Sequence, residues 1–241
     1  MDITELRDKT SALKIQKQSF INDTFLWVEI SRKAVDELPN TKFEFSTPKA
    51  HNPQQLRTVA RNHPEKIKSR IINKDIFNSA FVMIVACVED YLSKIIEYIL
   101  QTDSERIKCT VPGVNMVNSI SVIDLIDNSK EDLIDNIIRR RIENLFYASP
   151  QKQLEYLDKA LGLSVDSEIW GTWLEIKARR DIIVHNNSIV NQIYLDKASD
   201  HAKFSLGEEA VIDDNYFNDT IAFLKRMIGC IDREIRKVYK R

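Results

Sequence analysis

Apolar residues recur with a helical period along most of the chain, beginning close to the N-terminus. Between residues 3 and 38 they occupy every seventh position, at Leu6, Leu13, Phe20, Trp27 and Ala34, and the stripe is widened by Ile21, Phe25, Val28 and Val35. This spacing places them on one face of a single long helix. Pro39 cannot continue the backbone hydrogen-bond ladder, so the pattern predicts an N-terminal helix over residues 3–38.

The next segment interrupts this pattern. Residues 40–64 hold three of the six prolines, among mixed polar residues. They predict a long connection, with a short turn of helix near Gln54–Arg61. A connection of this length is unusual inside a compact domain, so we expect it to be functional or mobile.

The remaining residues, 65–241, are predicted to form a helical core. Its most apolar helix is expected to begin at a cap, Asn73 or Asp75, and to end near Thr102. Further helices are expected at Ser119–Asp127, Lys130–Phe146, Ser149–Gly162, Ser167 to about His185, and from Asp213 or Asp214 to the C-terminus. Residues 204–212 alternate apolar with polar positions around Gly207, which is typical of a small extended hairpin or an extended loop. We therefore expect an all-α fold, an elongated helical bundle in a single domain over residues 1–241.

The composition of the chain supports this fold class and limits its chemistry. Five Gly and six Pro, with 43% hydrophobic and 29% charged residues, are typical of long helices joined by few turns. The 35 Lys and Arg nearly balance the 36 Asp and Glu, which leaves a formal charge of −1. The protein therefore does not coat nucleic acid by its overall charge, and such a contact would need a local basic patch.

Neither a metal, a cofactor nor a membrane anchor is expected. The four histidines have no metal-ligand spacing, no Gly-rich phosphate loop is present, and the cysteines form no C-x-x-C pair, so we expect reduced thiols. The N-terminus lacks a basic region followed by an apolar stretch. The longest apolar run, Ala80–Val88, is too short to span a bilayer. These features predict a soluble, cytoplasmic protein.

Candidate chemistry gathers at the end of the helix predicted to close near His185. Arg180, Asp181 and His185 lie within six residues of one another. An arginine can hold a phosphate and stabilise charge that develops on it, and a histidine can move protons near neutral pH. Asp181 lies one turn before His185 and could accept an N–H from the imidazole, or it could pair with Lys177. We take Arg180, Asp181 and His185 as catalytic candidates.

The spacing of Arg180 and His185 resembles the R-x4-6-H motif of HEPN-superfamily ribonucleases. Residues 183–190 (IVHNNSIV) resemble the branch called RiboL-PSP-HEPN, and residues 77–100, with Glu89 in the middle, resemble the early core helix of that family. The resemblance implies a homodimer that cleaves RNA, such as tRNA or mRNA, without a metal. It also implies a bacterial toxin–antitoxin or antiphage setting, with an antitoxin or regulatory protein as a further partner. One HEPN subgroup, silenced by nucleotidylation, has tyrosine where this chain has Asn187, so that control is not expected here.

Helix geometry bears on the dimer. Five residues at about 100° each place Arg180 and His185 roughly 140° apart, so one regular helix cannot aim both at the same phosphate. A symmetric dimer could gather both groups from two copies of the helix. The alternative is a structural histidine at a helix end, in a non-catalytic helical module that binds RNA or a protein and dimerises through this helix.

Neighbouring residues are expected to support the motif. Glu89 interrupts an apolar helix, and an unpaired buried carboxylate is costly, so it predicts a pair with an arginine such as Arg180. Arg179 lies one turn after Glu175, which predicts a salt bridge. Asn186 and the residue after it are expected to end the helix, because Asn tolerates left-handed geometry. A hydrogen bond from Asn186 to a substrate is the less favoured alternative.

A basic stretch precedes the apolar core helix. Between residues 49 and 74 there are seven Lys or Arg and a single carboxylate, Glu65. A local excess of cations in a nearly neutral protein is what an RNA-positioning surface needs, although such a run can also be an ordinary solvated face. The candidate RNA-binding residues are Arg57, Arg61, Lys66, Lys68 and Arg70.

Overall fold

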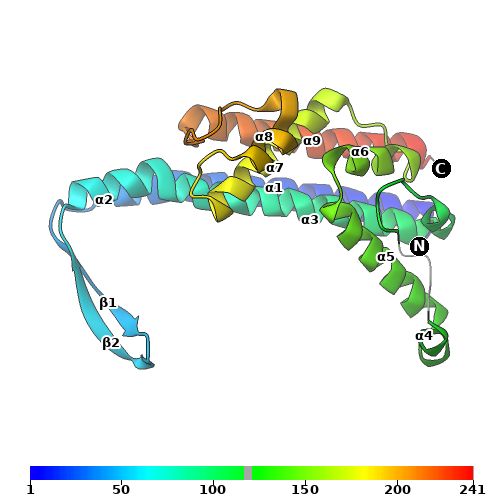
Figure 1. Ribbon diagram of the computed structural model, residues 1–241, viewed down its shortest axis with the longest axis horizontal. Coiled ribbons are helices and arrows are strands. Elements are labelled where there is room, and N and C mark those ends of the chain that lie inside the picture. Colours follow the sequence, from blue (N-terminus) through cyan, green and yellow to red (C-terminus); the bar gives the residue numbers. More distant parts are fainter. Residues whose placement is uncertain (117–120, 241) are drawn as a thin grey trace.

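The computed structural model describes residues 1–116 and 121–240, and it confirms a mostly helical, elongated bundle (Figure 1). Two long antiparallel helices lie side by side along its length. One is α1 (Ile3–Asp36), and the other is a continuous helix formed by α2 (Pro64–Arg70), the π-helical turn η1 (Ile71–Asp75) and α3 (Ile76–Thr102). The other helical elements are η2 (Ser104–Lys108), α4 (Val122–Asp127), α5 (Lys130–Tyr147), α6 (Pro150–Lys159), α7 (Ser167–His185), α8 (Gln192–Ala198), η3 (Ser199–His201) and α9 (Asp214–Val238).

The core forms around α3. Its side chains at Phe81, Ile84 and Val88 are inaccessible to solvent, because α1, α5, α7 and α9 all contact this helix. One face of α9 completes the core with Phe217, Leu224, Ile228, Ile231 and Ile235. Burial of this apolar surface is the main force that holds the helices together.

The N-terminal helix follows the prediction closely, since it begins at Ile3 and ends at Asp36. The buried stripe shifts along its length, however. Leu6 and Leu13 are buried as expected, but the stripe then continues through Ile21 and Val28, which leaves Phe20 and Trp27 about two-fifths exposed. An α-helix of 3.6 residues per turn drifts away from a seven-residue repeat, so a straight helix changes its buried positions after two repeats.

The prediction that residues 40–64 form an irregular connection with a short helical turn is wrong. Strands β1 (Phe43–Lys49) and β2 (Asn52–Arg61) form an antiparallel hairpin instead, and no helical turn occurs near Gln54–Arg61. The hairpin projects from the end of the bundle where α1 stops and α2 begins (Figure 1). Both strands are edge strands, with a neighbour on one side only. Proline is tolerated in such strands because its missing N–H need not form a hydrogen bond to a second neighbouring strand.

Three further segments bear on the sequence prediction. The core helix begins at Pro64 rather than at a cap, because Asn73 and Asp75 lie inside the π-helical turn. Residues 204–212 form the extended loop, the second of the two expected forms, and not the hairpin; within it Glu209 makes an isolated bridge with Ile189. Residues 119 and 120 of the expected helix Ser119–Asp127 lie outside the described residues, and α4 starts at Val122.

Among the described residues, one helix is long and apolar enough to cross a membrane by length and composition: the continuous helix Pro64–Thr102. Most of the apolar side chains of α3 face α1, α5, α7 and α9, so this helix serves as the core of the bundle. This arrangement is compatible with a soluble protein.

Candidate functional site

Helix α7, which carries the Arg180–His185 motif, is fixed to the bundle by a buried ion pair. Asp166 caps its start by accepting N–H groups from Glu168 and Ile169 at 2.9 and 3.2 Å. More than two turns into the helix, the predicted salt bridge is confirmed: Arg179 Nη2 lies 2.6 Å from Glu175 Oε1, and both side chains are only 1% exposed. A charge pair buried this deeply must be hydrogen-bonded on all sides to be tolerated.

Two tyrosines supply those hydrogen bonds. Tyr194 of α8 donates to Glu175 Oε1 at 2.8 Å, and Tyr216 of α9 donates to Glu175 Oε2 at 2.7 Å. Burial raises the pKa of Tyr194 to about 12 and the pKa of Tyr216 well above its ordinary value of 10.0, so both hydroxyls stay protonated donors. The Arg179 guanidinium also lies 3.6 Å from the centre of the Tyr216 ring. These contacts tie α7 rigidly to α8 and α9.

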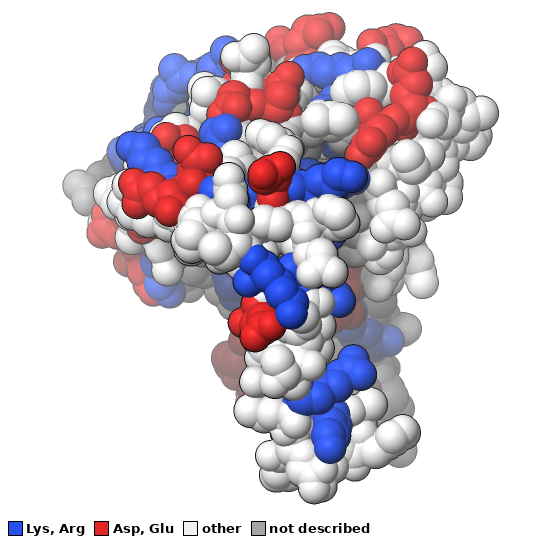
Figure 2. Space-filling model, turned by 90° about the vertical axis from the view of Figure 1, so that its left-hand side faces the viewer, with Lys and Arg blue, Asp and Glu red and all other residues white. Residues whose placement is uncertain are grey.

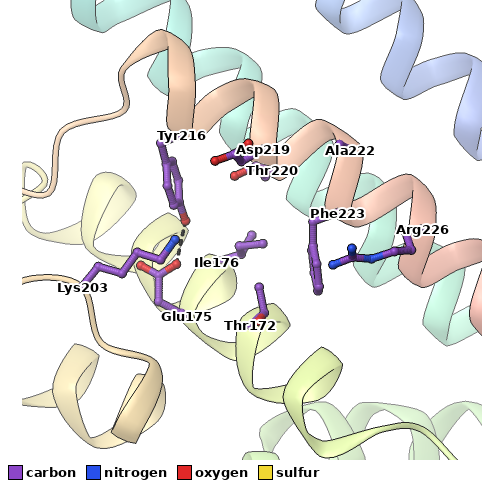
Figure 3. Close-up of a pocket in the computed structure, with 10 residues that line it drawn as sticks. All are labelled: Thr172, Glu175, Ile176, Lys203, Tyr216, Asp219, Thr220, Ala222, Phe223 and Arg226. Carbon is purple, nitrogen blue, oxygen red and sulfur yellow. Dashed lines mark hydrogen bonds between the residues drawn. The ribbon is translucent and has the colours of Figure 1, made fainter.

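A pocket of about 470 Å³ opens beside this network, between α7 and α9 (Figure 3). Its lining residues are Thr172, Glu175, Ile176, Lys203, Tyr216, Asp219, Thr220, Ala222, Phe223 and Arg226. Neither Arg180 nor His185 lines it. Nine residues separate Ile176 from His185, which is about 14 Å along a helix. The pocket is therefore separate from the motif that the sequence singles out.

The predicted contact between Glu89 and Arg180 is confirmed. Nη2 of Arg180 donates to Glu89 Oε2, and Lys177 lies 3.1 Å from the other carboxylate oxygen of Glu89. The Arg180 side chain is 21% exposed, so it sits at the edge of the core rather than inside it. Glu89 of α3 thereby fixes two cations of α7 at once.

Asp181 has partners that the sequence did not predict. It lies 2.9 Å from Arg180 Nη1 and 2.9 Å from Lys197 Nζ of α8, and it contacts neither His185 nor Lys177. The prediction that Asp181 orients the imidazole is therefore wrong for this chain, because α8 brings a cation closer. Nothing in the sequence near the motif indicates Lys197, which reaches Asp181 only through the fold.

Together these residues form an ion-pair chain across three helices. Its members, in order of contact, are Lys177, Glu89, Arg180, Asp181 and Lys197. Three cations against two carboxylates leave one positive charge in excess. Nε of Arg180 is buried and has no hydrogen-bond partner among the described residues, although its terminal nitrogens are both engaged. A buried donor without a partner is uncommon in folded proteins.

His185 is the last residue of α7, and its side chain is exposed. As predicted, the following asparagines end the helix: Asn187 has a φ of 51°, and Asn186 Nδ2 donates to Ile189 O at 2.6 Å. The amide nitrogen of Asn186 thus has a structural role. Because α7 is a regular helix through this region, Arg180 and His185 of one chain point in different directions.

The candidate RNA-binding residues fall into two groups. Lys68 donates to the carbonyls of Asp36 and Leu38 at 2.7 Å each, and Arg70 lies 3.0 Å from Asp75, so both have partners within the fold. In contrast, Arg57, Arg61 and Lys66 are exposed, and no described carboxylate lies within ion-pair distance of them. Figure 2 shows blue patches of Lys and Arg on the projecting lower part of the molecule, with a red carboxylate patch above the lowest of them and uncharged residues over most of its surface.

Comparison of the chain with family models, with curated proteins and with solved structures gives no match. The resemblance to HEPN ribonucleases therefore rests on the residues quoted for it and on their positions. Across residues 1–116 and 121–240, no group of three or more His, Cys, Asp and Glu side chains is placed to hold a metal ion.

Proposed function

We propose that this chain is a metal-independent endoribonuclease of the HEPN type, which acts through Arg180 and His185 at the seam of a homodimer in the bacterial cytoplasm. The observation that carries the proposal is the ion-pair chain. It fixes Arg180 at the edge of the core, five residues before the exposed His185. Such an arrangement supplies a positioned guanidinium, which can stabilise charge on a phosphate, and an accessible imidazole, which can transfer a proton.

In the proposed reaction, the ribose 2′-hydroxyl attacks the adjacent phosphorus while His185 accepts its proton. The bond from phosphorus to the 5′-oxygen breaks, and the partner subunit's His185 protonates that leaving oxygen. Atoms balance with a 2′,3′-cyclic phosphate and a 5′-hydroxyl as products. Arg180 stabilises the negative charge of the phosphorane. Glu89 and Asp181 engage two of the five N–H groups of the Arg180 guanidinium, which leaves others able to bind a phosphate.

The surface around the motif supports a seam between two copies. Val184, next to the histidine, is 49% exposed, and Ile189 and Ile193 beside it are exposed as well. Exposed apolar side chains that surround a charged site are typical of an interface. A twofold axis here would bring each Arg180 towards the other chain's histidine, which overcomes their divergence on one helix. A role in toxin–antitoxin or antiphage defence, with tRNA or mRNA as substrate, belongs to the same proposal.

The direct test is cleavage of total tRNA and mRNA by the purified protein in EDTA. We expect fragments that end in 2′,3′-cyclic phosphate. His185→Ala and Arg180→Ala should each reduce the rate by roughly 10²–10⁴ without unfolding the protein, because each removes one proton-transfer or charge-stabilising group. Arg233→Ala, which removes an exposed arginine of α9, is the matched control and should cleave normally. Equal rates for His185→Ala and the wild type would refute the proposal.

The second candidate is a non-catalytic helical module that binds RNA or a protein. The engagement of Arg180 by two carboxylates favours it, because a guanidinium paired in this way attracts a phosphate less strongly. In the same assay, RNA that shifts in a gel but stays intact would support the module over the enzyme.

A further inference from the structure

The hairpin has two chemically different faces. Cross-strand partners share a face, and successive residues of a strand alternate between faces. Phe43 lies opposite Arg61, Phe45 opposite Val59, and Thr47 opposite Arg57. We call these six residues the Arg–Phe face. The other face holds Glu44, Ser46, Pro48, Leu56, Thr58 and Ala60.

The arginines and aromatic side chains of these twelve residues are confined to one of the two faces. The Arg–Phe face has two arginines, two phenylalanines and no carboxylate, whereas the opposite face has Glu44 and no cation. Phe45 is 49% exposed and lies opposite Val59, midway between the two arginines. With about 3.4 Å per residue, Arg57 and Arg61 are roughly 14 Å apart along the strand. Cations therefore flank an accessible aromatic ring.

From this arrangement we infer that the hairpin binds single-stranded RNA, with bases stacked on Phe45 and Phe43 and phosphates held by Arg57 and Arg61. Bases of a single strand are free to stack on aromatic side chains, while those of a duplex are already stacked on one another. The negative charge of an RNA strand also complements the two arginines of the Arg–Phe face, whereas the opposite face carries Glu44 and no cation. The inference deepens the proposed ribonuclease function, since it names the class of RNA that reaches the site.

Contacts in the bundle connect the hairpin to the motif. Lys74 of η1 lies 2.6 Å from Glu209, and Glu209 forms a bridge with Ile189, four residues after His185. Ten residues of helix, about 15 Å, separate Lys74 from Pro64 at the root of the hairpin. The exposed cation Lys66 lies on this path. An RNA held on the Arg–Phe face would have to pass along α2 to reach the exposed His185.

The experiment measures RNA affinity apart from cleavage. Full-length protein carrying His185→Ala is titrated with a fluorescent oligouridylate and with an RNA duplex. Adding Phe45→Ala should weaken oligouridylate binding by about 5- to 150-fold, because one stacked base is lost, and should leave duplex binding unchanged. Adding Arg57→Gln with Arg61→Gln should lower the slope of log affinity against log salt by about 1.4, as expected for two phosphates on a single strand.

Thr58→Ala is the matched control, because it changes the same hairpin on its opposite face. Its affinity for oligouridylate should not change. The inference is overturned if Phe45→Ala and the double arginine variant bind oligouridylate like the control. It is also overturned if these variants lose self-association in light scattering while RNA binding persists, since the face would then contact a second copy.

Failure of this inference can be told apart from failure of the proposed function. If the wild type cleaves RNA but the variants of the Arg–Phe face bind RNA normally, the proposed nuclease function is supported and RNA binding by the hairpin is refuted. If RNA binding depends on the Arg–Phe face but the wild type cleaves no RNA, RNA binding by the hairpin is supported and the nuclease function is refuted.

Discussion

At Glu89, one carboxylate of α3 connects two cations of α7. It contacts Lys177 and Arg180, and all three side chains are about four-fifths buried. Pairs buried to this degree matter more to stability than surface pairs, because solvent screens them less. The position of Arg180 therefore depends on a residue that lies far away in the sequence.

We expect Glu89→Gln to lower the free energy of unfolding by about 1–2 kcal/mol, between the values typical of surface and buried pairs. The cleavage rate at saturating RNA should fall as well, because Arg180 loses a charged partner. Asp90→Asn is the matched control. Asp90 is the next residue and pairs with Lys17 at the surface, so its loss should change stability by less than about 1 kcal/mol. Denaturant unfolding and initial rates of the two variants measure the difference.

Should Glu89→Gln unfold and cleave like Asp90→Asn, the carboxylate would have no part in holding Arg180. A fall in affinity for RNA with an unchanged saturated rate would instead indicate that Glu89 affects binding alone.

Some of the ion pairs of α7 could be predicted from the sequence and others could not. The Glu175–Arg179 pair follows from helical spacing, and the Glu89–Arg180 pair follows from the high cost of an unpaired carboxylate in an apolar helix. The partner of Asp181 could not be predicted in the same way. Lys197 belongs to a different helix, and only the packing of α8 on α7 brings it within reach.

At the scale of elements, a glycine sets how closely η3 approaches α7. A Cβ atom on Gly171 would lie 2.0 Å from Nε2 of His201. The His201 ring therefore occupies space that only a glycine leaves open. This contact helps to fix the segment that leads from α8 towards α9, and hence the helix that carries the motif.

We expect Gly171→Ala to lower the free energy of unfolding by about 1–3 kcal/mol, because the His201 ring must move. Gly229 of α9 provides the matched control, since nothing lies within 4 Å of its added Cβ. Gly229→Ala should raise stability by up to about 1 kcal/mol through helix propensity. Thermal unfolding of both variants tests this difference.

His201→Ala introduced into Gly171→Ala should recover part of the lost stability, because the obstructing ring is then absent. Equal stabilisation by both glycine substitutions would show that the ring does not pack against α7 in solution.

The elements also differ in how well the sequence predicts them. Helices with an apolar period and clear caps, such as α7 and α9, were predicted at nearly their observed ends. The hairpin was missed, because its turn at residues 50 and 51 has neither glycine nor asparagine and its strands bury almost nothing. The start at Pro64 was missed because polar residues at 73 and 75 resemble caps. A proline in the first helical turn was the available signal.

For the whole molecule, the proposed twofold seam is the feature with the largest consequences. It would cover Val184 and the neighbouring apolar side chains that one chain leaves exposed. It would also place each histidine near the other chain's arginine. Catalysis would then require assembly, so the cleavage rate per chain should fall on dilution.

Val184→Glu should convert the protein to a monomer and abolish cleavage, because two like charges would face each other across the axis. The fold should change little, since surface substitutions usually shift stability by less than about 0.5 kcal/mol. Ile126→Glu, at a residue of α4 that is 76% exposed, is the control and should leave a dimer. Light scattering gives the mass of each variant. A Val184→Glu protein that is still dimeric and active would place the seam elsewhere.

The π-helical turn η1 has a consequence for the orientation of the hairpin. Hydrogen bonds in such a turn span five residues rather than four, so it accommodates one residue more than an α-helix does. Each residue contributes about 100° of rotation. Shortening residues 71–75 by one would therefore rotate α2, and the hairpin strand that leads into it, by roughly a quarter-turn relative to α3, at the cost of the bonds from Lys68 to the end of α1. A change in chain length at this turn could thus redirect the hairpin in a single step, without altering any residue of the core.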